Sequence, residues 1–176
     1  TDIAALRSGD SPYIPAEMHR VEAIAFDETV DLPDIDNENT RDLAEAYQQA
    51  EPRELLHSGL IRAKGRVYSD AEAIWVQVAV GDAGRDTNDA YLFHPALVDG
   101  SAMGSIFRPN TDEEQRLFLP LFYASFCASE PLIGACYTRI QNARVTYGEN
   151  LLDMTLEFFN ASGKKIAELK HFKNKL

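Results

Sequence analysis

The chain has 176 residues with 28 acidic and 17 basic side chains, a net charge of −11. Its length fits one domain and its 45% hydrophobic residues are typical of a globular protein, while an acid excess without a basic run argues against nucleic-acid binding. The sequence has no apolar run of about 18 residues for a membrane span and no signal-peptide pattern, so we expect a cytoplasmic location. It begins at Thr1 without Met, and we expect it to be part of a longer chain.

The acidic excess is concentrated in the N-terminal third of the chain. Residues 1–54 contain 14 acidic and 4 basic side chains, whereas residues 55–176 contain 14 and 13. The first part is rich in proline and charge, which predicts a linker rather than a packed core. Within it, residues 40–50 predict a short helix with Thr40 as its cap and Pro52 after its end. One face of this helix would be apolar, formed by Leu43, Ala46, Tyr47 and Ala50.

The next segments read as two strands followed by a helix. Residues 60–69 and 73–80 alternate between apolar and polar side chains, the pattern of strands with one buried face. Turn residues follow at 81–84. Residues 91–107 then form the longest apolar stretch with helical spacing, with Pro95 suited to the first helical turn.

The remainder of the chain predicts more sheet. Residues Asn160–Gly163 between the last two apolar segments are a hairpin signal. One apolar helix among several strands indicates an α+β fold, with a sheet that wraps around the helix to bury it. The strand-like segments after the helix are 117–128, 133–146, 151–159 and 165–174.

Asp99 is the strongest candidate for a residue with a chemical role. It shares one face of the predicted helix with Ala102, Met103 and Ile106, so a carboxyl group lies on an apolar stripe. Burial raises the pKa of a carboxylic acid and can keep it protonated near neutral pH, which a general acid requires. The alternative is that Asp99 caps a helix beginning at Gly100.

Two histidines lie near this segment. His94, directly before Pro95, could be a ligand, a base or a core histidine with satisfied hydrogen bonds, and the last reading is favoured. His57 reads as a loop residue at the border between the two parts of the chain. We find no spacing typical of a metal site, and we expect Cys127 and Cys136 to be reduced core residues.

Several motifs resemble one protein family. Phe93-His-Pro-Ala-Leu-Val-Asp-Gly100 resembles the His-Pro-Ala-Leu-Leu-Asp signature of dehydratase domains in modular polyketide synthases. Leu56-His-Ser-Gly-Leu-Ile-Arg62 is similar to the Tyr-Gly-Pro-x-Phe or His-Gly-x-Phe-Met element that starts the second half of those domains. Thr1–Arg7 is similar to the stretch joining the halves, and Leu117–Tyr123 to a Leu-Pro segment. The similarity is to synthases that use a separate acyltransferase.

The resemblance implies a double hotdog, two sheets that each wrap around a central helix. Residues 55–176 would be the second hotdog and residues 1–54 the linker between the two. The substrate would be a 3-hydroxyacyl thioester on the phosphopantetheine arm of an acyl carrier protein, with no cofactor or metal bound directly. The other expected partners are the first hotdog and a neighbouring ketosynthase.

The resemblance also implies site residues. Asp99 would protonate the leaving β-hydroxyl, while a histidine of the first hotdog removes the α-proton. The product would be an enoyl thioester. The residues that would line the substrate tunnel are His57, Gly59, His94, Pro95, Met103 and Pro120.

Three departures from the family pattern keep other functions open. The His-x-x-x-Gly-x-x-x-x-Pro element of the catalytic histidine is absent from this sequence. Met103 stands where the family often has Gln or His, and His57 and Ile61 replace aromatic residues. The alternatives are a double-bond isomerase, a pyran-forming cyclase, a branching-module scaffold, or a stand-alone hotdog thioesterase or hydratase that dimerises. Isomerases of this kind commonly lose the aspartate, and Asp99 is retained.

Overall fold

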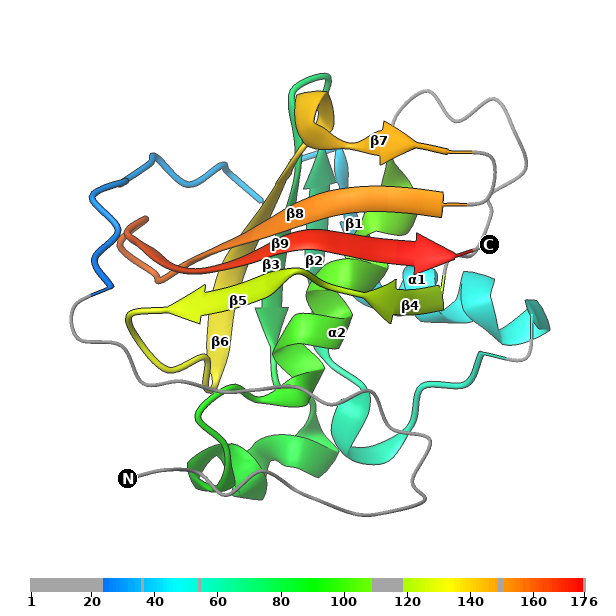
Figure 1. Cartoon of the computed structure of the whole chain (residues 1–176). Helices are drawn as coiled ribbons and strands as arrows, with labels where there is room; N and C mark the ends of the chain where they lie inside the picture. Colours follow the sequence, from blue (N-terminus) through cyan, green and yellow to red (C-terminus); the bar gives the residue numbers. More distant parts are fainter. Residues whose placement is uncertain (1–23, 36, 54, 109–118, 149–150, 176) are drawn as a thin grey trace, which may run out of the picture.

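The computed structural model describes residues 24–35, 37–53, 55–108, 119–148 and 151–175, so the motif at Thr1–Arg7 lies outside the described residues. In this part of the chain an antiparallel sheet curves around one central helix, α2 (Pro95–Met103) (Figure 1). The predicted α+β hotdog is therefore confirmed. The strands are β1 (Thr40–Asp42), β2 (Lys64–Ser69), β3 (Ala73–Ala79), β4 (Leu119–Phe122), β5 (Ser125–Ala128), β6 (Ala135–Gln141), β7 (Thr146–Tyr147), β8 (Leu151–Phe159) and β9 (Lys165–Lys175).

The strands are hydrogen-bonded in the order β1-β2-β3-β6-β8-β9-β4. Two short strands join this path from the side, since β5 also pairs with β9 and β7 pairs with β8. Several expected strands are shorter than predicted or divided. The segment 117–128 contains β4 and β5, and 133–146 contains β6, a 3-10 turn η5 (Asn142–Arg144) and β7.

The helix α2 lies directly on the sheet because its contact face is built from small residues. Ile74, Val76 and Val78 on the inner face of β3 are fully buried in the main core. A Cβ atom at Gly104 would stand 2.4 Å from the Val76 side chain, and one at Gly100 would stand 2.6 Å from Ala63 Cβ. A larger residue at either position would push the helix off the sheet. After Met103 the chain continues as the 3-10 segment η4 (Gly104–Phe107).

The short helix predicted within the linker is present as α1 (Leu43–Ala50), and its predicted apolar face is buried. Its cap is Asp42 rather than Thr40, because the helix begins at Leu43 and both Thr40 and Asp42 belong to β1. The Asp42 carboxylate accepts the Ala44 N–H at 2.8 Å, and Glu45 accepts the Asp42 N–H in return. Because α1 shares the core with residues after position 55, that position marks a change in composition within one packed structure. The linker role of residues 1–54 stays a prediction.

The remaining connections include three more 3-10 segments, η1 (Glu51–Arg53), η2 (Gly59–Ile61) and η3 (Asp82–Ala90). The predicted hairpin between β8 and β9 is present at Asn160–Gly163. The Asn160 side chain accepts the backbone N–H of Ser162, and Gly163 adopts a φ of 78° that favours glycine.

Residues 24–35 run over the outer face of the sheet, and we call them the strap. The Val30 N–H donates to the carbonyl of Gly163, and the Lys165 N–H donates to the carbonyl of Glu28, each at 2.9 Å. Val30 and Leu32 pack against a second apolar cluster on that face. Trp75, Phe159 and Ala73 are its buried members. The sheet is therefore covered on both faces, by α2 inside and by the strap outside.

Candidate functional site

The N-terminus of α2 decides between the two interpretations of Asp99. The helix begins at Pro95, and His94 is its cap, with Nδ1 accepting the Ala96 N–H at 3.2 Å. Nε2 of His94 lies 3.1 Å from the Thr87 hydroxyl oxygen, and the side chain is fully buried. The capping role considered for Asp99 is therefore wrong, because Asp99 lies one turn inside the helix. His94 has a polar partner at each ring nitrogen, as the core reading expects.

Asp99 faces a cavity of about 100 Å³ between α2 and the inner face of β8. The helix contributes the face predicted from its spacing, with Asp99, Ala102, Met103 and Ile106 all in the lining. Across from it, β8 contributes Leu152 and Met154. The other lining residues are Leu55, His57, Ser105, Arg108, Pro120 and Asn174.

A histidine from another part of the chain meets Asp99 in this cavity. Nε2 of His57 lies 3.2 Å from Oδ2 of Asp99, although the two atoms are not aligned as a hydrogen bond. The His57 side chain is 8% exposed and that of Asp99 is 25% exposed. The pair is therefore shielded on the histidine side and accessible to a ligand on the aspartate side.

Burial raises the pKa of Asp99, and the nearby His57 offsets only part of this effect. The net shift favours the protonated acid, which can donate a proton to a bound molecule. Burial also raises the pKa of Tyr47, to about 12, so this phenol beside the pair stays neutral. The electrostatics of the cavity thus suit proton donation by Asp99.

The structure brings together four of the residues predicted for the site. Asp99, His57, Met103 and Pro120 line the same cavity. Gly59, His94 and Pro95 are outside its lining. Gly59 begins η2 with a φ of 59°, a conformation that explains why glycine stands there. The roles of all these residues toward a substrate stay predictions.

Three polar residues of the lining were not predicted: Ser105, Arg108 and Asn174. Arg108 follows η4, and its guanidinium lies 5.4 Å from the centre of the Tyr147 ring. Burial lowers the pKa of Arg108. Asn174, from β9, is buried and its amide donates to the carbonyl of Phe172 at 3.1 Å. None of the three belongs to a motif, so the local sequence contains no signal for its place in the cavity.

The part of the chain that the structure describes holds no cluster of three metal-ligating side chains. The same residues include no helix of the length and hydrophobicity needed to span a membrane.

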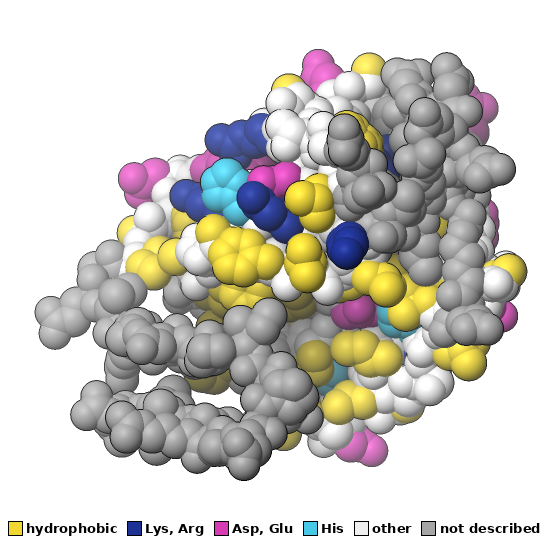
Figure 2. All heavy atoms as spheres, turned by 45° about the vertical axis from the view of Figure 1, so that its right-hand side comes forward, with side chains coloured by type: hydrophobic (Ala, Val, Ile, Leu, Met, Phe, Trp, Pro, Cys, Tyr) yellow, Lys and Arg dark blue, Asp and Glu magenta, His cyan; other side chains and the backbone are white. Residues whose placement is uncertain are grey.

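An exposed apolar strip lies at the rim of the site. Strand β4 is the last strand of the hydrogen-bonded order, and Leu119, Leu121, Phe122 and the adjacent Tyr123 are each about half exposed. Figure 2 turns this side of the molecule forward and shows hydrophobic side chains gathered there. Exposed patches of this kind mark interaction surfaces.

Comparisons with known proteins agree with the fold. No family model matches the chain. Over 165 residues it is 41% identical to polyketide synthase PksM of Bacillus subtilis, covering 93% of this chain and 4% of that protein. It is 40% identical over 173 residues to PksL of the same organism, covering 96% of this chain and 4% of that protein.

A solved structure extends the similarity to three dimensions. It is a monomeric dehydratase domain from a split module of a polyketide synthase with a separate acyltransferase. The identity is 41% and the TM-score 0.80, over 86% of this chain and 57% of that one. The chain thus spans little more than half of that domain and a small fraction of the two synthases.

The curved sheet around a central helix, with an aspartate facing a cavity, defines a hotdog domain of the dehydratase type. The chain belongs to the dehydratase-domain family of modular polyketide synthases and corresponds to one hotdog half of such a domain.

Proposed function

We propose that this hotdog is the acid-bearing half of a dehydratase domain that removes water from 3-hydroxyacyl chains on an acyl carrier protein. The observation that carries the proposal is the place of Asp99, on the cavity-facing side of α2 with a raised pKa. An apolar lining suits an acyl chain, and the acid is the group that such a leaving hydroxyl needs.

The reaction balances with one acid and one base. The base removes the proton on Cα, and that electron pair forms the Cα–Cβ double bond. The Cβ–O bond breaks, and its electron pair leaves with the oxygen, which takes the Asp99 proton and departs as water. Asp99 is left as a carboxylate and must be reprotonated before the next cycle.

The base is proposed to come from a first hotdog that packs against this one. The solved dehydratase domain is longer than its match with this chain, so it contains further structure beside the matched half. The apolar strip on β4 is a suitable contact for another subdomain, because apolar side chains gain free energy when they leave water. The carrier protein and a neighbouring ketosynthase remain proposed partners, and the cytoplasm the proposed location.

The experiment uses the full synthase domain that carries this chain, with a 3-hydroxyacyl chain loaded on the carrier protein. We expect loss of one water by mass spectrometry and a large decrease in the Asp99→Asn variant. Asp153→Asn is a matched control, since that side chain is 24% exposed and lies 3.2 Å from His171 on the outer face. The control should keep full activity.

The alternatives give different outcomes. A double-bond isomerase or a pyran cyclase would convert a suitable chain without loss of water, and a branching-module scaffold would return it unchanged. A stand-alone hotdog thioesterase or hydratase would be active as a dimer of this chain. Each of these results would contradict the dehydratase proposal.

A further inference from the structure

His57 differs from His94 in what its ring nitrogens contact. His94 uses both nitrogens, one for the helix cap and one for Thr87. His57 approaches Asp99 through Nε2 at 3.2 Å, while its Nδ1 is buried without a hydrogen-bond partner. Within the described residues, Asp99 is therefore the polar contact of the His57 ring.

The buried Nδ1 indicates which nitrogen holds the proton of the neutral ring. With the proton on Nε2, this N–H points toward the Asp99 carboxyl group and Nδ1 is an unpaired acceptor. The other tautomer would bury an unpaired N–H donor and turn a lone pair toward Oδ2. We therefore expect the Nε2–H form, which donates to Oδ2 and leaves the acid proton on Oδ1.

The His57 ring is held in place by packing against α1 and by a contact of its backbone carbonyl. The ring of Tyr47 in α1 packs on it with centres 4.9 Å apart. Tyr47 is itself fully buried, and its hydroxyl oxygen accepts the Ala63 N–H at 3.1 Å. The Arg62 guanidinium lies over the Tyr47 ring, 5.2 Å from its centre, and donates to the His57 backbone carbonyl at 3.4 Å. The contact with Asp99 therefore depends on packed neighbours rather than on a loose loop.

The helix itself provides little to orient Asp99. One turn further along the same face stands Met103, whose thioether is a weak acceptor and no donor. A carboxyl group without a donor can rotate about its bond, and misplacement of a reacting group by about 1 Å can lower a rate by about 100-fold.

We propose that His57 is a positioning residue that orients the Asp99 carboxyl group and stabilises the carboxylate left after proton donation. This role rests on the proposed function of Asp99 as the acid. The contact would align during catalysis, because such hydrogen bonds are often poorly aligned in a site without substrate.

The charges around the pair allow the effect to be measured. Among the residues that the structure describes, the other titratable groups near the site are Tyr47 from α1, Arg62 after η2 and Arg108 after η4. Loss of His57 removes a polar partner that lowers the pKa of Asp99. Activity requires the protonated acid, so the alkaline limb of the kcat profile should move to higher pH when His57 is replaced.

The kinetic test compares three variants in the full domain. His57→Leu should lower kcat about 10- to 100-fold and leave KM within about threefold. His57→Gln should recover part of the loss, because its amide can donate to Asp99. His171→Gln is the control, since it removes an exposed histidine 3.2 Å from an aspartate and should change nothing. A His57→Leu variant with wild-type kcat and pH profile would overturn the proposal.

A spectroscopic test separates this inference from the proposed function. Nitrogen NMR of the ¹⁵N-histidine-labelled domain should show His57 protonated at Nε2, with a resonance that shifts in Asp99→Asn. If the domain eliminates no water, the proposed function fails and the NMR result still decides the contact. A His57 resonance that does not shift in Asp99→Asn would overturn the positioning role, whether or not the domain eliminates water.

Discussion

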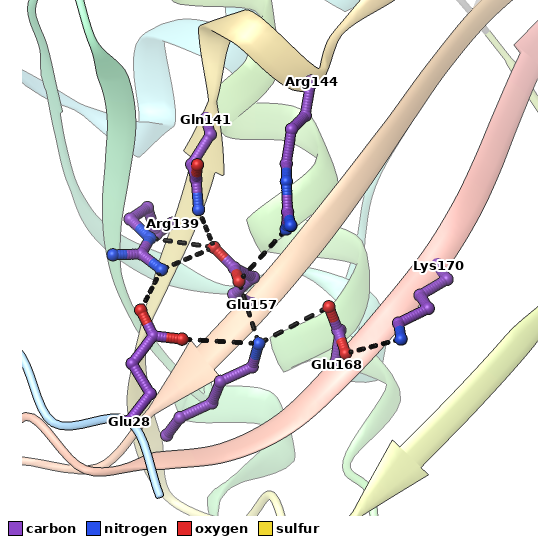
Figure 3. A network of polar contacts seen from close by, with 8 residues as sticks. Glu28, Arg139, Gln141, Arg144, Glu157, Glu168 and Lys170 are labelled. Carbon is purple, nitrogen blue, oxygen red and sulfur yellow. Dashed lines mark hydrogen bonds and ion pairs between the residues drawn. The ribbon is translucent and has the colours of Figure 1, made fainter. Parts of the chain in front are cut away.

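Asp99, on helix α2, and Glu157, on strand β8, lie on opposite sides of the sheet, and their surroundings shift the two pKa values in opposite directions. Asp99 faces the inner cavity with one histidine beside it. Glu157, whose side chain is 3% exposed, is the centre of an ionic network on the outer face of β6, β8 and β9 (Figure 3). Burial alone would raise both pKa values.

The donors around each carboxyl group make the difference. Glu157 accepts hydrogen bonds from Arg139, Gln141 and Lys165, each at 2.8 Å. These bonds outweigh the desolvation and lower the pKa of Glu157. A buried carboxyl group with several cationic donors is thus a structural anion, whereas one with a single imidazole can remain an acid.

The largest effect is expected for Asp99→Asn. The amide has the same shape but no acidic proton, so dehydration should fall by about 10²- to 10⁴-fold. The melting temperature should change little, since the Asp99 side chain is partly exposed and does not cap the helix. Mass spectrometry of the acyl chain and thermal unfolding measure the two quantities. Unchanged turnover would remove Asp99 from the chemistry.

Glu157→Gln tests the outer face. It leaves Arg139 and Lys165 with less negative charge, and the loss of a buried ion-pair partner costs about 3 kcal/mol. For a protein of this size the melting temperature should fall by about 6–12 °C. Turnover well below that temperature should persist. Glu130→Gln, in an exposed pair with Lys164, should cost about 0.5 kcal/mol or less.

Gly163→Ala tests the strap. A Cβ atom there would stand 2.0 Å from the Val30 carbonyl oxygen, so the strap would have to move. The matched control is Gly134→Ala, which has a similar positive φ of 69° and no atom within 4 Å of the new Cβ. Both variants place alanine in a left-handed backbone conformation, which costs about 1 kcal/mol. Gly163→Ala should cost more and speed hydrogen exchange at residues 28–32. Equal effects of the two variants would contradict the contact.

The smallest effect is the dependence of stability on pH. The pKa of Glu157 is lowered from 4.5 in the folded state, so its stabilisation is present above 4.5 and is lost as the pH falls below it. The pKa of Asp99 is raised from 3.8, so its effect has the opposite sign and stability falls as the pH rises through this range. Melting curves between pH 3 and 6, roughly the range of these groups, should show a flatter acid limb in Glu157→Gln. They should show a steeper one in Asp99→Asn.

The sequence predicted what local spacing determines. The helix, its acidic residue on an apolar face and the strand pattern of residues 73–80 follow from residues close together in the chain. The contact of His57 with Asp99 joins positions far apart, and His57 in isolation resembled a loop residue. The cap at Asp42 was missed because Thr40 is an equally suitable cap by type, whereas the helix begins at Leu43, directly after Asp42.

The outer network was missed for the same reason. Arg139 contacts Glu28, 111 positions earlier in the sequence, so no local window contains both. The alternation in β8 does place Glu157 on the face opposite Leu156 and Phe158. It does not show that cations from β6 and β9 would surround it. Such long-range pairs depend on strand order, which local spacing leaves open.

The strap has a consequence for recombining synthases. A hybrid enzyme that exchanges this hotdog at a junction after Leu32 would replace the segment that supplies Glu28 and Val30. Arg139 and Lys165 would lose one of their carboxylates, and the cluster around Trp75 and Phe159 would lose part of its cover. Such a graft would be weakened on the face away from the Asp99 cavity, although every residue of that cavity had been transferred. Residues 24–35 should therefore move together with the hotdog they cover.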